Sequence, residues 1–232
     1  QTLTHAQEAF LQTAGSIQAA SSDNMALTTG ASHSGVAYAQ VPSALLQVQE
    51  VVRQAAVDRV HQALAVSQSH TGVWSSADYI TGSTAPAGWN QADTDIGGLS
   101  LGYDFAVGDH LILGAFINQS SVETDWSDYG GKLKSKPTSL GVYGKYRFGP
   151  AYLLGLGHIQ HAEADLSRYQ VTTTEVTRVT ASTDTQAASL YGEFGYAFRF
   201  ASQAATVTPF IGLNHDYVKM DGFDDDAGSS AG

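Results

Sequence analysis

The sequence predicts an antiparallel, up-and-down transmembrane β-barrel with one α-helix inside its lumen. Three observations lead to this fold class: long segments in which apolar and polar residues alternate, short and long connections that alternate between those segments, and aromatic residues at the segment ends that meet the short connections. Successive side chains of a strand point to opposite faces, so one face of each strand meets an apolar medium and the other a polar one. A tilted strand that crosses a membrane needs about 9–11 residues, which most of these segments exceed.

The composition narrows the class of protein. The chain has 232 residues, 24 glycines, no cysteine, 14% charged residues and a formal net charge of −11. Its apolar runs are too short for a membrane-spanning helix, which needs about 20 residues. The lack of cysteine excludes disulfides and thiolate metal sites, and the acidic balance argues against nucleic acid as a partner. No signal peptide opens the sequence, so we expect it to be already removed or encoded upstream.

The first 70 residues divide into two parts. Residues 1–40 are small and polar, with a short helix expected around Ala6–Ala19, and we interpret them as a linker or the remnant of a passenger segment. Residues 41–70 contain no glycine and only Pro42, which predicts a helix over Ser43–Ser69, about 40 Å long at 1.5 Å per residue. A solvated connector helix and a plug that spans a polar lumen both fit this pattern. The polar residues relevant to a plug are Glu50, Arg53, Asp58 and Arg59.

Residues 71–232 contain seven predicted strands in meander order. They are Val73–Ile80, Asp95–Ala106, His110–Trp126, Lys132–Phe148, Ala151–Gln170, Thr185–Phe200 and Ala205–Met220. The predicted short connections are 107–109, 149–150 and 201–204, and the mostly longer ones are 81–94, 127–131, 171–184 and 221 onward. The aromatic ends are Tyr103, Phe105, Tyr146, Phe148, Tyr152, Tyr196, Phe198 and Phe200. One strand alone would equally fit a soluble barrel, but the two rims favour an outer-membrane barrel with an interfacial aromatic girdle.

The odd number of strands raises a difficulty. Bacterial single-chain barrels have an even number, and an open sheet edge in lipid would leave backbone groups unpaired at several kcal/mol each. We therefore expect residues 71–232 to form the N-terminal part of a barrel that further strands complete. Pairing with another chain is the alternative.

Several segments resemble one family. They are Gly72-Val73-Trp74, Gly98 to Asp104, Ser139 to Phe148, Ala188 to Phe200, Thr208 to Leu213 and Asp221-Gly222-Phe223. In order and spacing they resemble the translocator β-domain of type Va autotransporters. The resemblance implies a monomeric twelve-stranded barrel, about seven strands of which are present here, in the bacterial outer membrane. It also implies an N-terminal passenger at the cell surface and assembly by the barrel-insertion machinery.

Two function hypotheses follow, with a third that is weaker. The first is an outer-membrane translocator that exports and anchors its own N-terminal passenger. The second is a stand-alone outer-membrane porin or adhesin without passenger export, and the third is a soluble ligand-binding barrel. We expect no enzymatic activity and no cofactor within this chain.

Three patterns that suggest chemistry have simpler explanations. Gly98 to Gly102 matches G-x-S-x-G, but the central Ser100 lies in the middle of an alternating strand rather than at a strand-to-helix turn. His158 and His161 are three residues apart, so they lie on opposite faces of a strand and do not share a metal. The acidic run Asp224–Asp226 has no EF-hand frame and is expected to be a solvated loop.

Counting positions along the strands predicts which polar residues face the lumen. These are Asp104, Lys145, Arg147, Glu193, Arg199, Asn214 and Asp216. Charges of both signs in a confined lumen can pair with the polar residues of the helix and hold it, although simple hydration is the alternative. Lys132, Lys134 and Lys136 share the outward parity of Leu140. We expect them to lie at the headgroup level and to contact lipopolysaccharide phosphates, or else to lie on a solvated strand extension.

Overall fold

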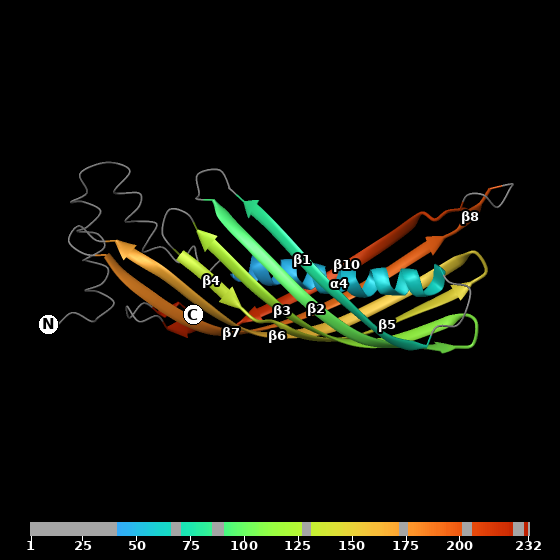
Figure 1. Ribbon diagram of the computed structural model, residues 1–232, viewed down its shortest axis with the longest axis horizontal. Helices are drawn as coiled ribbons and strands as arrows, with labels where there is room; N and C mark the ends of the chain where they lie inside the picture. Colours follow the sequence, from blue (N-terminus) through green and yellow to red (C-terminus); the bar gives the residue numbers. More distant parts are fainter. Residues whose placement is uncertain are drawn as a thin grey trace.

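The computed structural model describes residues 41–65, 71–84, 91–126, 131–171, 176–200, 206–224 and 230–231. Helix α4 (Val41–Ala65) lies against a long, twisted antiparallel sheet (Figure 1) and contacts β1, β2, β3, β5, β6, β7 and β10. No helix in this part of the chain combines the length and the hydropathy needed to cross a membrane. The predicted combination of an antiparallel barrel-type sheet with a central helix is confirmed.

Eight strands form the main sheet. They are β1 (Gly72–Thr84), β2 (Ala92–Val107), β3 (Leu111–Trp126), β4 (Gly131–Ser135), β5 (Thr138–Phe148), β6 (Ala151–Val171), β7 (Val176–Tyr196) and β10 (Phe210–Met220). Two small hairpins are β8 (Phe198–Arg199) with β9 (Thr206–Val207), and β11 (Phe223–Asp224) with β12 (Ser230–Ala231). β4 and β5 both pair with β3 and β6, so they act as one strand interrupted at Lys136 and Pro137. Proline has no amide hydrogen to donate to the ladder, which explains the interruption of the predicted strand Lys132–Phe148.

Neighbouring strands follow one another along the chain, so the meander of seven crossings is confirmed. Within the described residues, the hydrogen-bonded path runs from β1 to β10 and does not close on itself. Two turns join strands at one end of the sheet, where Gly108 and Gly149 adopt φ angles of 63° and 64°. Glycine enters this left-handed region without a steric penalty. We call this end the short-turn end and the opposite one the far end.

Two strand predictions are wrong in their bounds. Val171–Asp184 is not a long loop, because β6 and β7 stay paired until Val171 lies opposite Val176. The sixth strand does not continue to Phe200: β7 ends at Tyr196, and the amide of Ala197 donates to the carbonyl of Pro150 at 2.8 Å. The predicted helix at residues 6–19 and the turn at 201–204 lie outside the described residues, as do the last residues of the predicted helix from position 66.

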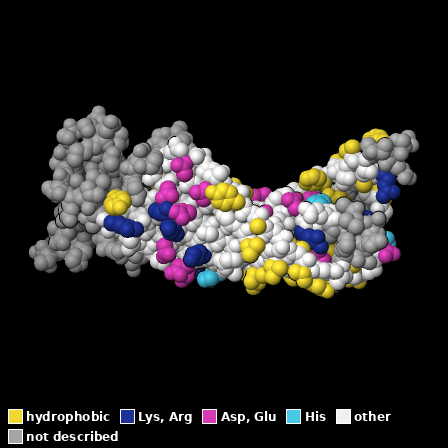
Figure 2. All heavy atoms as spheres, in the orientation of Figure 1, with side chains coloured by type: hydrophobic (Ala, Val, Ile, Leu, Met, Phe, Trp, Pro, Cys, Tyr) yellow, Lys and Arg dark blue, Asp and Glu magenta, His cyan; other side chains and the backbone are white. Residues whose placement is uncertain are grey.

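The outer face of the sheet has two zones. Hydrophobic side chains gather on the half nearer the short turns, and acidic and basic side chains gather toward the far end (Figure 2). Exposed residues of the hydrophobic zone are Leu99, Leu101, Tyr103, Phe105, Ile117, Leu140, Val142, Tyr146, Phe148, Leu153, Ile159, Leu190, Phe194 and Tyr196. Of the eight predicted girdle aromatics, seven are exposed, whereas Tyr152 is 7% exposed and points inward. It lies opposite inward-facing Gly195, so its place among the girdle residues was wrong.

Glycine and aromatic residues alternate on the inner wall. An added Cβ at Gly102, Gly114 or Gly195 would collide with the ring of Trp74, Tyr143 or Tyr152 on a neighbouring strand. Each ring therefore lies over a position where only glycine leaves room. This packing fixes the rings against the wall and aims the polar atoms of Trp74, Tyr143 and Tyr152 along it.

Candidate functional site

The candidate site is the interface between α4 and the inner wall. Its part near the far end is apolar. On α4, Val41, Leu45, Val48 and Val52 are each at most 1% exposed. They belong to one hydrophobic cluster with inward-facing residues of the far half of the sheet, namely Ile96, Val122, Trp126, Leu133 and Leu166. Since burial of one such side chain contributes about 1.5–3 kcal/mol, this cluster is a large source of helix docking energy.

The part of the interface nearer the short turns combines buried apolar residues of α4, such as Val57 and Val60, with a polar cluster that contains an ion pair. Arg59 of α4 donates from Nε to Oδ2 of Asp104 on β2 at 2.7 Å, and its Nη2 lies 2.6 Å from the same oxygen. The other oxygen of Asp104 accepts a hydrogen bond from the Tyr143 hydroxyl, which in turn accepts from Trp74 Nε1 at 2.8 Å. Asp104 is fully buried. Its charge is tolerated there because both oxygens are hydrogen-bonded and one faces a guanidinium.

A second polar cluster surrounds Glu193 of β7. Its Oε1 accepts from the Tyr152 hydroxyl and its Oε2 from the Tyr191 hydroxyl, each at 2.6 Å. His61 of α4 lies between this carboxylate and Lys145, with Nε2 3.1 Å from Glu193 Oε1 and Nδ1 3.0 Å from Lys145 Nζ. The Lys145 ammonium also lies 3.9 Å from the centroid of the Tyr152 ring. One histidine of α4 is thus fixed by both a cation and an anion of the wall.

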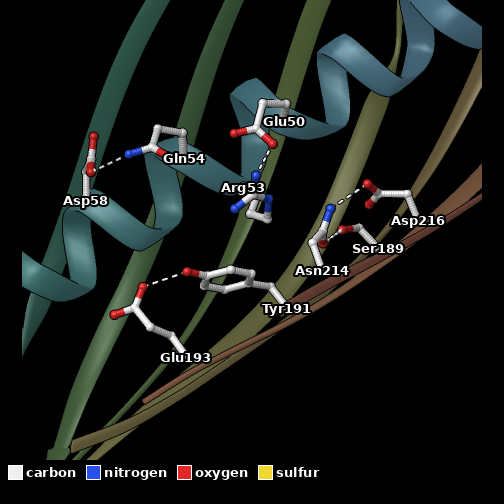
Figure 3. Close-up of polar contacts among 9 residues, drawn as sticks. All are labelled: Glu50, Arg53, Gln54, Asp58, Ser189, Tyr191, Glu193, Asn214 and Asp216. Atoms are coloured by element: carbon white, nitrogen blue, oxygen red, sulfur yellow. Dashed lines mark hydrogen bonds and ion pairs between the residues drawn. The ribbon is translucent and has the colours of Figure 1, made fainter. Parts of the chain in front are cut away.

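Arg53 marks the boundary between the two parts. Its guanidinium lies 4.8 Å from the centroid of the Tyr191 ring and pairs with Glu50 on the same helix (Figure 3). One helical turn further, Gln54 donates to Asp58 at 2.8 Å, so this carboxylate is paired along the helix. Arg53 therefore reaches the wall through the face of a ring.

Some polar side chains near the middle of the lumen have no hydrogen-bond partner among the described residues. The amide of Gln49, both ring nitrogens of His158 and the Nε2 of Gln160 are buried without one. Asn214 and Asp216, on the last strand, hydrogen-bond to each other, and Ser189 donates to Asn214 at 3.3 Å (Figure 3). This level of the lumen has hydrogen-bonding capacity that water molecules can satisfy.

Only some of the predicted lumen residues contact α4. Asp104, Lys145 and Glu193 contact α4, whereas Asn214 and Asp216 face the lumen on the open edge strand β10. Arg147 donates instead to the carbonyl of Asp109 in the turn at 3.1 Å. Arg199 is exposed in β8, and no contact within the described residues joins it to α4. Its inward parity assumed a continuous strand, which Ala197 interrupts.

Sequence reasoning missed four residues that complete the polar part. They are His61, Tyr143, Tyr152 and Tyr191. Tyr143 and Tyr191 share the parity of Lys145 and Glu193 on their own strands, so applying the same count to uncharged polar side chains would have identified them. The strand of Tyr152 carries no predicted lumen residue from which to count. For His61, only its position two residues after Arg59 gave a signal.

The patterns that suggested chemistry have structural roles or none. Ser100 is fully buried within β2 and accepts a hydrogen bond from Asn118 at 2.9 Å, so it is not presented to a substrate. His158 is buried and His161 exposed, on opposite faces of β6. Asp224 lies in β11, and positions 225 and 226 lie outside the described residues. Within the described ranges, no group of three or more potential ligands is placed to hold a metal ion.

The three lysines lie on the outer face near the far end. Lys132 pairs with Glu123 and, at 3.2 Å, with Asp125, and Lys134 lies 3.9 Å from Glu123. Lys132 and Lys134 also line a surface groove of about 550 Å³ beside Arg178. Their charges are largely compensated by carboxylates of β3. Lys136, at the interruption between β4 and β5, is exposed.

Comparisons with known proteins agree with this architecture. The family profile "Autotransporter beta-domain" matches residues 73–232. The solved translocator domain of the autotransporter NalP from Neisseria meningitidis matches with a TM-score of 0.71 at 18% identity, over 84% of this chain and 65% of that one. The chain thus spans slightly less than two thirds of that domain. The β-domain of the Bordetella autotransporter BrkA covers 70% of this chain and 88% of its own at 14% identity, but its TM-score of 0.36 carries no argument. Comparison with curated protein sequences gives no match.

Proposed function

Because the chain belongs to the autotransporter β-domain family, we propose that it exports an N-terminal passenger and anchors it at the bacterial cell surface. Members of the family are outer-membrane β-barrels, and this chain has the apolar outer belt that such a location requires. The observation that carries the proposal is the placement of α4, which runs through the lumen and is bonded to the wall by Arg59 and His61. The helix is then the last exported segment, retained in the pore.

The direction of the helix supports this order of events. Arg59 and His61, near its C-terminal end, lie beside residues close to the short turns, and Val41 lies toward the far end. In outer-membrane barrels the short turns face the periplasm and the longer connections face outward. The chain that precedes Val41 is thereby directed to the cell surface. We propose residues 1–40 as the linker or passenger remnant, 41–70 as the lumen-spanning helix and 71–232 as part of the barrel.

The open path of the sheet bears on how the pore is completed. The edges β1 and β10 are not paired to each other in the described residues, and unpaired backbone in lipid costs several kcal/mol per group. We propose that further strands between β10 and β1 close the barrel, and that the outer-membrane insertion machinery assembles it.

The role of Lys136, Lys132 and Lys134 at lipopolysaccharide phosphates stays a prediction. Because Lys132 and Lys134 pair with Glu123, Lys136 is the freer cation of the three.

Passenger export can be tested with the full-length protein in cells. An epitope tag placed directly before Gln1 should be accessible to antibody and to added protease on intact cells. A matched tag in the short turn at Gly108–Asp109 should become accessible only after the outer membrane is permeabilised. If the upstream tag stays protected while the barrel migrates as a folded, heat-modifiable band, the chain is a barrel without passenger export.

A further inference from the structure

His61, near the C-terminal end of α4, contacts an ammonium and a carboxylate of the inner wall at the same time. Its Nδ1 lies 3.0 Å from Lys145 Nζ on β5, and its Nε2 lies 3.1 Å from Glu193 Oε1 on β7. A lysine ammonium has hydrogens to donate and no acceptor, so Nδ1 has to be the acceptor of this hydrogen bond. Nε2 then carries the hydrogen and donates it to Glu193. The docked imidazole is therefore neutral and present as one tautomer.

A second proton on His61 would disrupt this arrangement. It would bind to Nδ1, where it would remove the hydrogen bond from Lys145 and face an ammonium 3.0 Å away. The repulsion from Lys145 and the added attraction to Glu193 act over nearly equal distances, so they largely cancel. The lost hydrogen bond and the partial burial of the charged ring are not offset. Docking of the helix therefore opposes protonation of His61.

Two further charged groups act on this pair in opposite directions. Asp58, on the same helix, attracts a protonated His61, but its carboxylate already accepts a hydrogen bond from Gln54 at 2.8 Å. Arg147, the next inward position of β5 after Lys145, adds positive charge on the side of the wall. Neither group removes the conflict between the second proton and the ammonium.

The remaining neighbours of His61 contribute little net charge. From β6, the Tyr152 ring packs edge-on against the imidazole with 5.7 Å between the centroids, and its hydroxyl donates to Glu193. On the side of β2, Asp104 and Arg59 neutralise each other in their ion pair. The response of His61 to pH thus depends chiefly on the ammonium of β5 and the carboxylate of β7.

We propose that His61 and Lys145 form a pH-sensitive latch, which holds the last turns of α4 to the wall at neutral pH and loosens as the medium becomes acidic. Histidine gains its proton between about pH 7.5 and 5.5. In this range the imidazole of an undocked helix takes up a proton that the docked one lacks, so acid shifts the equilibrium toward the undocked form. The latch does not depend on passenger export, because it needs only the docked helix.

The test measures how often this end of the helix opens, by labelling a thiol with maleimide in the purified full-length protein. Val60, beside His61, is 0% exposed, so the thiol of Val60→Cys reacts only when the helix opens. Its rate is read at that position by mass spectrometry and divided by the rate of Gln62→Cys, an exposed neighbour, which removes the effect of pH on the thiol itself. From about pH 7.5 to 5.5 the ratio should rise about fivefold, since uptake of one proton changes an equilibrium by at most about tenfold per pH unit.

Two substitutions identify the group and its partner. His61→Gln can form hydrogen bonds but cannot take up a proton, so the ratio should no longer depend on pH. Lys145→Met removes the ammonium, so a protonated His61 would face Glu193 without repulsion, and the ratio should fall about threefold on acidification. Lys145→Gln, which also lacks the charge, replaces Lys145→Met if that protein does not fold.

The position control lies in the part of the helix that has no histidine. Val48→Cys is also 0% exposed before substitution, and its rate, divided by that of the exposed Gln47→Cys, should stay constant with pH. A constant ratio for Val60→Cys would overturn the latch, as would a rise that persists in His61→Gln. A rise of the same size without the Lys145 ammonium would show that burial of the ring alone sets the response, which also contradicts the proposal.

Discussion

The two halves of α4 meet the same wall through different chemistry. Toward the far end, Leu45 and Val48 are buried in an apolar cluster. Toward the short turns, Arg59 and His61 are held by a carboxylate, an ammonium and tyrosine hydroxyls. The outer face shows the opposite distribution, with an apolar zone near the short turns and a charged zone near the far end (Figure 2).

The inner and outer faces of the sheet thus change character in opposite directions along its length. Where the outer face is apolar, the inner wall carries the buried charged residues Asp104, Lys145 and Glu193 among apolar ones. Where the sheet stands beyond the hydrophobic belt, its interior can pack like that of a soluble protein, with Val48 and Leu133 in one core. Apolar side chains are buried along the whole helix, Val57 and Val60 included, so the ion pair and hydrogen bonds near the short turns add register to a contact that is apolar throughout.

The largest effect is expected in the apolar half. Leu45→Asp would place an unpaired charge where the side chain is 1% exposed, and should weaken helix docking by about 4 kcal/mol or more. Leu45→Met is the matched control, since it keeps an apolar side chain of similar volume at the same buried position. The measurement is the urea concentration at which the heat-modifiable band of the full-length protein is lost. Equal shifts for the two variants would remove the distinction between the halves.

A smaller, specific effect is expected in the polar half. A double-mutant cycle with Arg59→Gln and Asp104→Asn should give a coupling energy of about 1–3 kcal/mol, because Asp104 is fully buried. The same cycle on the exposed pair Lys132 and Asp125 should give less than about 1 kcal/mol. Denaturant midpoints provide both values. A coupling near zero for the inner pair would mean that water screens the lumen and that the polar half does not hold the helix.

The alternation of apolar and polar residues along each strand predicted which face of the sheet a side chain lies on, but not which residue of α4 it contacts. Asp104, Lys145 and Glu193 could be assigned to the inner wall because a period of two needs only an uninterrupted strand. Their partners depend on the register between α4 and seven strands, which no local pattern encodes. The lumen position of Arg199 stays a prediction, because Ala197 interrupts the strand along which its face was counted. Tyr152 was misread because aromatic residues near a rim fit either face.

The length of β6 and β7 was underestimated for a related reason. The stretch from Val171 to Asp184 is rich in threonine and charged residues, which reads as a loop. In the structure only every second residue, such as Val179, faces the interior. A buried inner face at this level is therefore hard to recognise from the sequence, because only every second residue contributes to it. The length of α4, by contrast, was visible from the absence of glycine and of any proline after Pro42.

The smallest effect concerns Arg53, at the boundary between the halves. Its pair with Glu50 lies on the helix surface, where Glu50 is 55% exposed, and should contribute less than about 0.5 kcal/mol. A guanidinium 4.8 Å from the Tyr191 ring in a confined lumen should contribute about 0.5–2 kcal/mol. Arg53→Gln should therefore lower the denaturant midpoint more than Glu50→Gln does. In a Tyr191→Phe background, which keeps the ring, Arg53→Gln should retain its effect. If Glu50→Gln matches Arg53→Gln, the surface ion pair accounts for the loss, and the polar half of the interface begins only at Arg59.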